Sequence, residues 1–184
     1  MASAYDVAAF IRAELGGVSR MKLQKLLYYS QAWTLTWDAQ PLFQERIEAW
    51  PDGPVVRELW GLEKHFGVRD GDASALSVSE QENVREVLRV YGAKSGDWLS
   101  ALSHREVPWC AARRGCAPNE QSQAAITPDA LRAYFCGIPT PRKHLTPDLV
   151  RGMNLLTSIP PDEVDGLLDE ADESLEELRR SIAS

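Results

Sequence analysis

The sequence predicts a mainly α-helical protein, with one compact multi-helix domain, at most a small β element near residues 44–50, and a C-terminal amphipathic helix. Apolar residues recur at helical spacing through most of the first 137 positions, and capping residues, glycines and prolines separate the helical segments. Only the run 44–50 shows the alternation of a strand, and it is short. The 184 residues are enough to bury one core without disulfides or metal.

Two helices are expected before residue 40. Ser3 is suited to cap the first helix, and Gly16 and Gly17 end it. Ser19 is suited to cap the second, which runs to about Trp37 and has a broad apolar face. The polar side chains of this second helix are expected to lie mainly elsewhere on it: Lys22, Gln24, Lys25 and Gln31.

The middle of the chain combines the extended run with further helices. A turn over residues 51–54 follows the run, and Pro54 is expected in the first turn of a third helix that Gly67 ends. Ser79 and Glu82 have the spacing of a capping box for a fourth helix. Shorter helices are expected over residues 97–102, 108–114 and 128–135, the last capped by Thr127.

Composition then divides the chain into three parts. Residues 1–137 form the helical domain, and residues 138–160 form a connector with several prolines and one short helix near residues 147–157. Residues 161–184 form the acidic amphipathic helix.

This C-terminal segment accounts for the whole net charge of −7, because it holds nine acidic and two basic residues whereas residues 1–160 hold 18 of each. Its apolar residues alternate in steps of four and three, as in an a/d seam. An isolated helix of about twenty residues is marginal in water. The seam is therefore expected to dock on its own domain, on a second copy or on a partner. The candidate contacts are Leu168, Leu175 and Leu178 as apolar anchors, and Asp169, Glu173 and Glu176 as carboxylates.

Composition also disfavours several classes of protein. The first six residues lack the features of a secretory signal, no apolar run is long enough to span a membrane, and three cysteines argue against a disulfide framework. We therefore expect a cytoplasmic protein without membrane contact. A neutral body disfavours non-specific nucleic-acid binding. Only two small groups of basic residues support nucleic-acid binding: Arg20, Lys22 and Lys25, or Arg113 and Arg114.

Catalytic, metal and cofactor sites are not expected. The sequence lacks phosphate-binding glycine loops, zinc-protease motifs and nucleophile elbows. His104 lies near Cys110 and Cys116, with Cys136 further on, but five residues separate the first two cysteines, more than paired zinc ligands usually have. Trp50 and Trp109 lie beside turns and prolines, where an indole often borders a surface groove, so both are candidates for partner contact.

Spaced motifs in the first 136 residues resemble a known family. They comprise the run Lys22-Leu23-Gln24-Lys25-Leu26-Leu27-Tyr28-Tyr29-Ser30-Gln31-Ala32-Trp33, Pro41-Leu42-Phe43, Ile47-Glu48-Ala49-Trp50, Gly53-Pro54-Val55, and Leu102-Ser103-His104-Arg105-Glu106-Val107-Pro108-Trp109. In this order they resemble the Panacea domain, a GepA-like family found on phages and prophages. The resemblance covers about residues 5–136 and not the segment after Gly137.

The resemblance implies an antitoxin, which neutralises a toxin encoded by an adjacent gene through direct binding. The family pairs one helical scaffold with unrelated toxins, including alarmone-synthetase-like enzymes. A proteolytic adaptor that delivers the toxin to a protease and a DNA-binding transcriptional regulator are the alternatives, and a homo-oligomer stays open. The resemblance assigns a scaffold role to Lys22, Gln24, Lys25, Tyr28, Tyr29, Trp33, Glu48, Gly53, Pro54, His104 and Pro108. Glu48 is expected to brace the turn, and His104 to cap or orient the Pro108–Trp109 segment.

Overall fold

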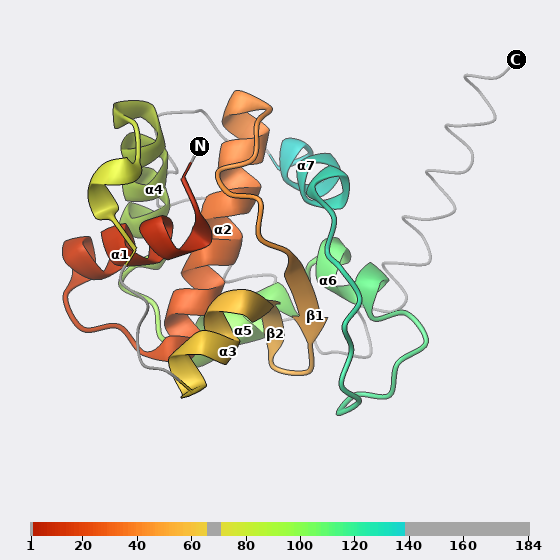
Figure 1. The fold of residues 1–184 in the computed structure, drawn as a ribbon. Coiled ribbons are helices and arrows are strands. Elements are labelled where there is room, and N and C mark those ends of the chain that lie inside the picture. The colour runs from red at the N-terminus through yellow and green to blue at the C-terminus, as the bar shows by residue number, and fades with distance from the viewer. Residues whose placement is uncertain (1, 66–70, 139–184) are drawn as a thin grey trace, which may run out of the picture.

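A computed structural model describes residues 2–65 and 71–138 (Figure 1). Within these residues, helices dominate and one β-hairpin is present, as the sequence predicts. The elements are α1 (Ala4–Leu15), α2 (Arg20–Asp38), β1 (Ile47–Trp50), β2 (Gly53–Val56), α3 (Arg57–His65), the 3-10 helix η1 (Ala73–Ala75), α4 (Val78–Tyr91), α5 (Gly96–Ser103), α6 (Val107–Ala112) and α7 (Pro128–Cys136).

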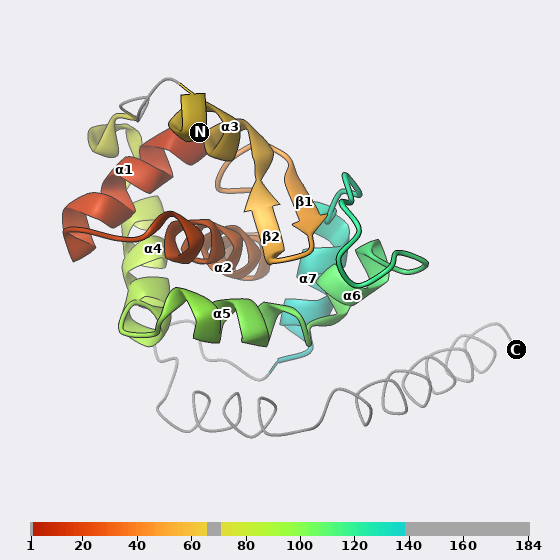
Figure 2. The ribbon, with the colours of Figure 1, turned by 90° about the horizontal axis from the view of Figure 1, so that it is seen from below.

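Helix α2 is the centre of the domain. Figure 2 looks along its axis and shows α1, α4, α5, α7 and the hairpin arranged around it. Every residue from Leu23 to Leu35 is buried. The expected division of this helix into an apolar face and a separate polar part does not hold, because Gln24, Lys25 and Gln31 are buried too. A helix covered on all sides has no solvent-facing stripe, so its polar side chains need partners inside the protein.

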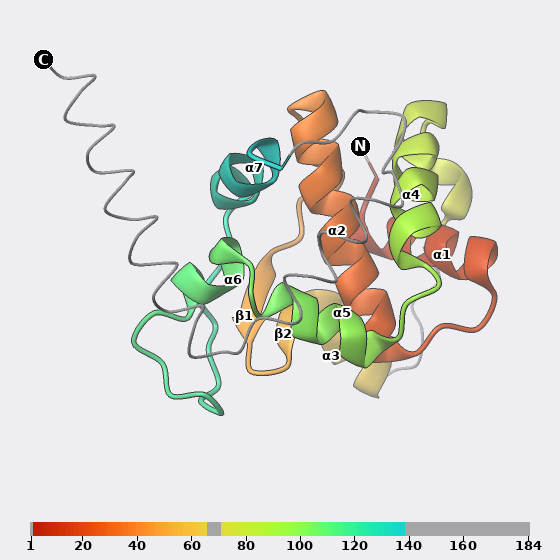
Figure 3. The ribbon, with the colours of Figure 1, turned by 180° about the vertical axis from the view of Figure 1, so that it is seen from behind.

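Most helix starts agree with the sequence. Ser3, Ser19 and Thr127 cap α1, α2 and α7 with their side chains. Helix α4 differs, because its capping box is formed by Ser77 and Glu80 instead of Ser79 and Glu82. Both pairs have the same spacing, and the earlier one lets α4 begin directly after the buried Leu76. Figure 3 shows the opposite side of the domain, where α7 packs against α2 and α6.

The start of the third helix also differs from the sequence-based expectation. Pro54 lies in strand β2, paired with Ala49, and the third helix begins only at Arg57. Two β-branched residues, Val55 and Val56, favour the extended conformation here over the start of a helix. Gly53, with φ of 98°, completes the turn.

A third extended segment, residues 124–126, lies along the other side of β1. The amide of Ala49 donates to Ala124 O at 2.9 Å, and the amide of Ile126 donates to Ile47 O at 2.9 Å. Glu48 and Ala125 form an antiparallel bridge. The segment carries no clear alternation of its own, and the sequence did not indicate it.

Among the described residues, no helix is both long and apolar enough to cross a membrane. The short helix expected near residues 147–157 and the acidic helix over 161–184 lie outside the described residues. So do the six candidate contacts on the latter: Leu168, Asp169, Glu173, Leu175, Glu176 and Leu178.

Candidate functional site

Two polar side chains of α2 hold the hairpin from inside. Gln24 Oε1 accepts a hydrogen bond from the amide of Val56 at 2.7 Å, and Lys25 Nζ donates to Pro54 O at 3.2 Å. Burial lowers the pKa of Lys25 to about 7, and the charge of Asp52 opposes this shift. A Cβ at Gly53 would lie 2.6 Å from Lys25 Nζ, so the turn and the lysine fit together only with glycine at this position.

Other side chains of α2 hold further parts of the domain. Gln31 Oε1 accepts hydrogen bonds from the amides of Leu42 and Phe43 at 2.9 and 3.2 Å, and its Nε2 donates to Phe43 O at 3.0 Å. Lys22 Nζ donates to Gly92 O, which links α2 to the end of α4. Trp33 Nε1 donates to the Tyr91 hydroxyl at 3.1 Å. These side chains thus secure neighbouring elements against α2.

Glu106 is the buried partner of the two tyrosines of α2. The oxygens of its carboxyl group accept hydrogen bonds from the hydroxyls of Tyr28 at 2.7 Å and Tyr29 at 3.1 Å. Burial raises the pKa of Glu106 to about 8, although both hydrogen bonds act against the shift. The sequence argument did not select this residue. The sequence did contain a signal for this contact. The motif 102–109 includes an acid, and the motif 22–33 includes two adjacent tyrosines.

His104 ends α5 and packs against α6. Its ring stacks on the indole of Trp109, with centroids 4.3 Å apart and planes 24° from parallel. Burial lowers the pKa of His104 to about 4, and the charges of Lys25 and Arg113 add to the shift, so the ring is neutral at pH 7. Pro108 is buried in the first turn of α6.

The cysteines near His104 do not build a metal site with it. Cys110 Sγ lies 3.1 Å from His104 O and donates to that backbone oxygen. In the part of the chain that the structure describes, no three or more His, Cys, Asp or Glu side chains are grouped to hold a metal ion.

Arg113 is a second residue whose role the sequence did not indicate. Its guanidinium is buried and donates to Ala49 O at 3.0 Å, on the central strand. It also donates to three carbonyls of the following loop, those of Ala117, Pro118 and Glu120, at 2.9, 3.1 and 2.9 Å. The sequence grouped Arg113 with Arg114, and Lys25 with Arg20 and Lys22, as candidate basic patches. Arg113 and Lys25 are buried, so for these two residues the grouping is wrong.

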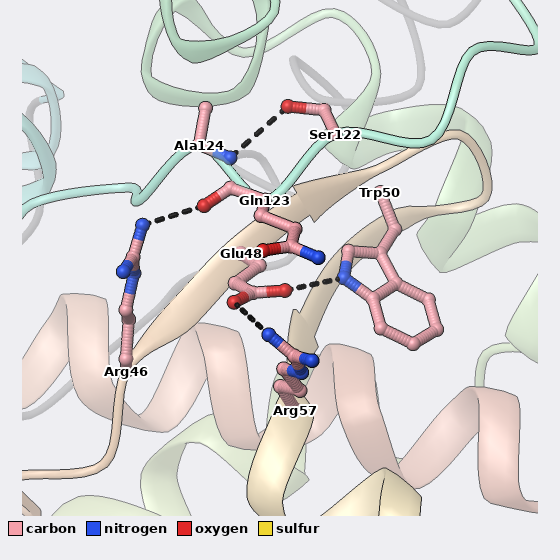
Figure 4. Close-up of polar contacts among 7 residues, drawn as sticks. All are labelled: Arg46, Glu48, Trp50, Arg57, Ser122, Gln123 and Ala124. Carbon is pink, nitrogen blue, oxygen red and sulfur yellow. Dashed lines mark hydrogen bonds and ion pairs between the residues drawn. The ribbon is translucent and has the colours of Figure 1, made fainter.

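The outer face of the hairpin is the side turned away from α2. Because side chains alternate along a strand, Arg46, Glu48 and Trp50 point to this side, together with Val55 and Arg57 across the hairpin. Figure 4 shows the polar contacts there. The Glu48 carboxylate accepts a hydrogen bond from Trp50 Nε1 at 2.8 Å and pairs with Arg57 Nη1 at 3.6 Å. Arg46 Nη2 donates to Gln123 O.

Helix α3 and the start of α2 extend this face. The rings of Trp50 and Trp60 pack edge to face, with centroids 5.8 Å apart. The guanidinium of Arg20 lies over the Trp60 ring, 3.9 Å from its centroid. Trp109 Nε1 donates to Trp50 O at 3.0 Å, so the two tryptophans singled out from the sequence are neighbours. We call the set Arg20, Arg46, Glu48, Trp50, Arg57 and Trp60 the outer hairpin face.

These contacts describe a helical scaffold that has a braced hairpin on its surface. A family model described as antitoxin SocA-like, Panacea domain, matches residues 23–110, which include α2, the hairpin and the motif around His104. Over residues 23–110, just under half of the chain, the sequence is therefore similar to the SocA-like Panacea domain, which is the resemblance that its motifs suggest. No curated protein and no solved structure matches the chain. The family match supports a role of the toxin–antitoxin type.

Proposed function

We propose that this protein is an antitoxin that neutralises a toxin, encoded by an adjacent gene, by binding it directly. The match of residues 23–110 to the Panacea family carries this proposal. The structure gives it a physical basis. The motif side chains Gln24, Lys25 and Gln31 of α2 are hydrogen-bonded inside the domain. Partner contacts therefore fall to the surface of the scaffold and to segments outside it. An alarmone-synthetase-like enzyme is one class of toxin that such a scaffold would serve.

We further propose that residues 161–184 contribute to toxin specificity. Nine acids and an apolar seam in one short segment are features of an amphipathic helix that docks on a partner. Interface energy usually concentrates in a few anchors, so only some of the candidate residues named above are expected to matter.

A plating assay tests both proposals. The adjacent gene is induced alone, together with the full chain, and together with a version that ends at Pro160. The proposal predicts that the adjacent gene is toxic and that the full chain relieves the toxicity. It also predicts that the shorter version protects less. Toxicity that persists with the full chain would refute the antitoxin proposal, and equal protection by both versions would refute the role of residues 161–184.

Purified components separate direct binding from delivery to a protease. The proposed mechanism predicts that the protein inhibits the toxin when no protease is present. Inhibition that requires an added protease would instead support the proteolytic adaptor.

A further inference from the structure

We propose that the outer hairpin face is the surface on which the toxin docks, and that the toxin presents carboxylates and an apolar side chain to it. This inference rests on the proposed antitoxin function and names the surface and the chemistry of the contact. It is built from residues that do not belong to the hydrophobic core of the domain.

The first argument is charge. Arg20 and Arg46 are exposed, and the side chain of Arg57 is 54% exposed. Glu48, the carboxylate among the residues of this face, is 4% exposed. A docking partner therefore meets three exposed arginine side chains, whereas Glu48, the carboxylate that pairs with Arg57, is buried.

The acids next to these arginines in the sequence have other contacts or positions. Glu45 accepts a hydrogen bond from the amide of Ala4 at 3.0 Å. Asp52 is exposed at the turn, and its charge acts on Lys25 and His104. Glu58 is exposed but lies about 100° around α3 from Arg57. The face thus favours an anionic partner.

The second argument is the geometry of the groups. A guanidinium that stacks on an indole has its N–H donors directed outward in its own plane, where they match a carboxylate. The Arg20 guanidinium lies over the Trp60 ring at 3.9 Å from its centroid, a distance that suits such stacking. Trp50 and Trp60 are each partly exposed and supply apolar surface between the charges. Tryptophan and arginine are the residues most enriched among those that dominate interface energies.

The third argument is that the face is held in place before any partner binds. Glu48 fixes both the indole of Trp50 and the guanidinium of Arg57, and Trp109 donates to the backbone of Trp50. Side chains that are already ordered lose less conformational entropy on binding, which raises affinity. Glu48 therefore acts as a positioning residue for this surface.

A protein partner fits these observations better than a nucleic acid. Base stacking needs an open ring face, but Arg20 covers a face of Trp60, and Trp50 packs against the same ring. The 18 acids and 18 bases of residues 1–160 also leave no net positive charge to attract a phosphate backbone.

The experiment compares charge-removing variants of the full chain. The face variant carries Arg20→Gln, Arg46→Gln and Arg57→Gln. The control carries Arg85→Gln, Arg89→Gln and Arg132→Gln, which remove the same charge from α4 and α7. A third variant replaces the three face arginines with lysine, which keeps the charge and loses the planar pairing. Affinity for the purified product of the adjacent gene is measured by titration calorimetry at two salt concentrations, and thermal unfolding is recorded for each variant.

We expect the face variant to bind at least about tenfold more weakly and with less dependence on salt, at unchanged thermal stability. The lysine variant should lie between it and the wild type, and the control should bind within about twofold of the wild type.

Wild-type affinity in the face variant would overturn this inference and leave the antitoxin proposal intact. Failure of the wild type itself to bind would refute the antitoxin proposal. Two further outcomes would also overturn the inference. One is loss of nucleic-acid binding by the face variant with unchanged toxin affinity. The other is increased hydrogen exchange in residues 161–184 with unchanged toxin affinity, which would assign the face to the chain's own acidic segment.

Discussion

Helix α2 and the outer hairpin face both combine aromatic with polar side chains, but they use them differently. Gln24 and Lys25 of α2 are buried and bind backbone atoms of other elements. On the outer face, Trp50 and Arg57 are bound to a buried carboxylate yet stay partly exposed. The difference teaches that the polar side chains of a motif can be held by contacts inside the fold. Substitutions of these α2 residues should lower the free energy of unfolding, whereas substitutions on the outer hairpin face should weaken binding of the toxin.

The largest effect on the scaffold is expected from Gly53→Ala. Alanine is strained at a φ of 98°, and its Cβ would displace the Lys25 ammonium that it meets at 2.6 Å. Backbone strain, overpacking and a displaced buried charge together predict a loss of roughly 3 to 6 kcal/mol in the free energy of unfolding. Gly17→Ala is the matched control, because no atom lies within 4 Å of its added Cβ. Denaturant unfolding of both variants measures the difference, and similar losses would contradict the account.

Glu106→Gln should change the pH dependence of stability. Burial raises the pKa of Glu106 to about 8 in the folded protein, from an ordinary value of 4.5. Between these values the folded protein keeps a proton that the unfolded chain has lost. Stability from this group is therefore present below pH 4.5 and is lost as the pH rises to 8.

The stability of the wild type relative to Glu106→Gln should accordingly fall by roughly 2 to 4 kcal/mol from pH 5 to pH 8. The titrations of Lys25 and His104 are common to both proteins and cancel in this difference. Unfolding curves at the two pH values measure it, and parallel profiles would show that Glu106 is ionised in the fold at pH 5.

Gln24→Met should lower the free energy of unfolding by a smaller amount, because it removes one hydrogen bond to the hairpin and keeps the side-chain volume. The buried amide of Val56 would lose its acceptor, which predicts a loss of about 1 to 3 kcal/mol. Thermal unfolding and hydrogen exchange of the Val56 amide measure the effect. Unchanged exchange at this amide would show that the brace does not hold β2.

The smallest effect on stability is expected from Arg57→Gln. Its pair with Glu48 spans 3.6 Å, and its side chain is more than half exposed, so solvent screens the interaction. We predict a loss below about 1 kcal/mol in chemical denaturation. A larger loss would show that this arginine belongs to the scaffold, and the proposed division between α2 and the outer face would not hold there.

The sequence predicted the helical class and most helix limits well, because capping serines, glycines and apolar spacing are local signals. It failed where tertiary contacts decide the outcome. The full burial of Gln24, Lys25 and Gln31 depends on elements distant in the chain, as does the pairing of residues 124–126 with β1. Glu106 and Arg113 became recognisable only once their partners, 77 or 78 and 64 residues away, were in place.

The candidate site shows the same limit. Trp50 and Trp109 were selected because turns and prolines flank them, and they are in contact. The arginines of the outer hairpin face come from three places in the chain: Arg20 from the start of α2, Arg46 from the segment before β1, and Arg57 from the start of α3. No local sequence pattern therefore groups them. The anchors proposed on residues 161–184 stay predictions.

The central claim is that α2 supports the fold while the outer hairpin face binds the toxin. Its most direct test is to measure, side by side, the affinity of Gln24→Met and of the triple arginine-to-glutamine face variant for the purified product of the adjacent gene, at a temperature where both are folded. We predict that Gln24→Met unfolds earlier but binds as the wild type does, and that the face variant keeps its stability but binds at least about tenfold more weakly. Weakened binding by Gln24→Met together with wild-type binding by the face variant would contradict the account.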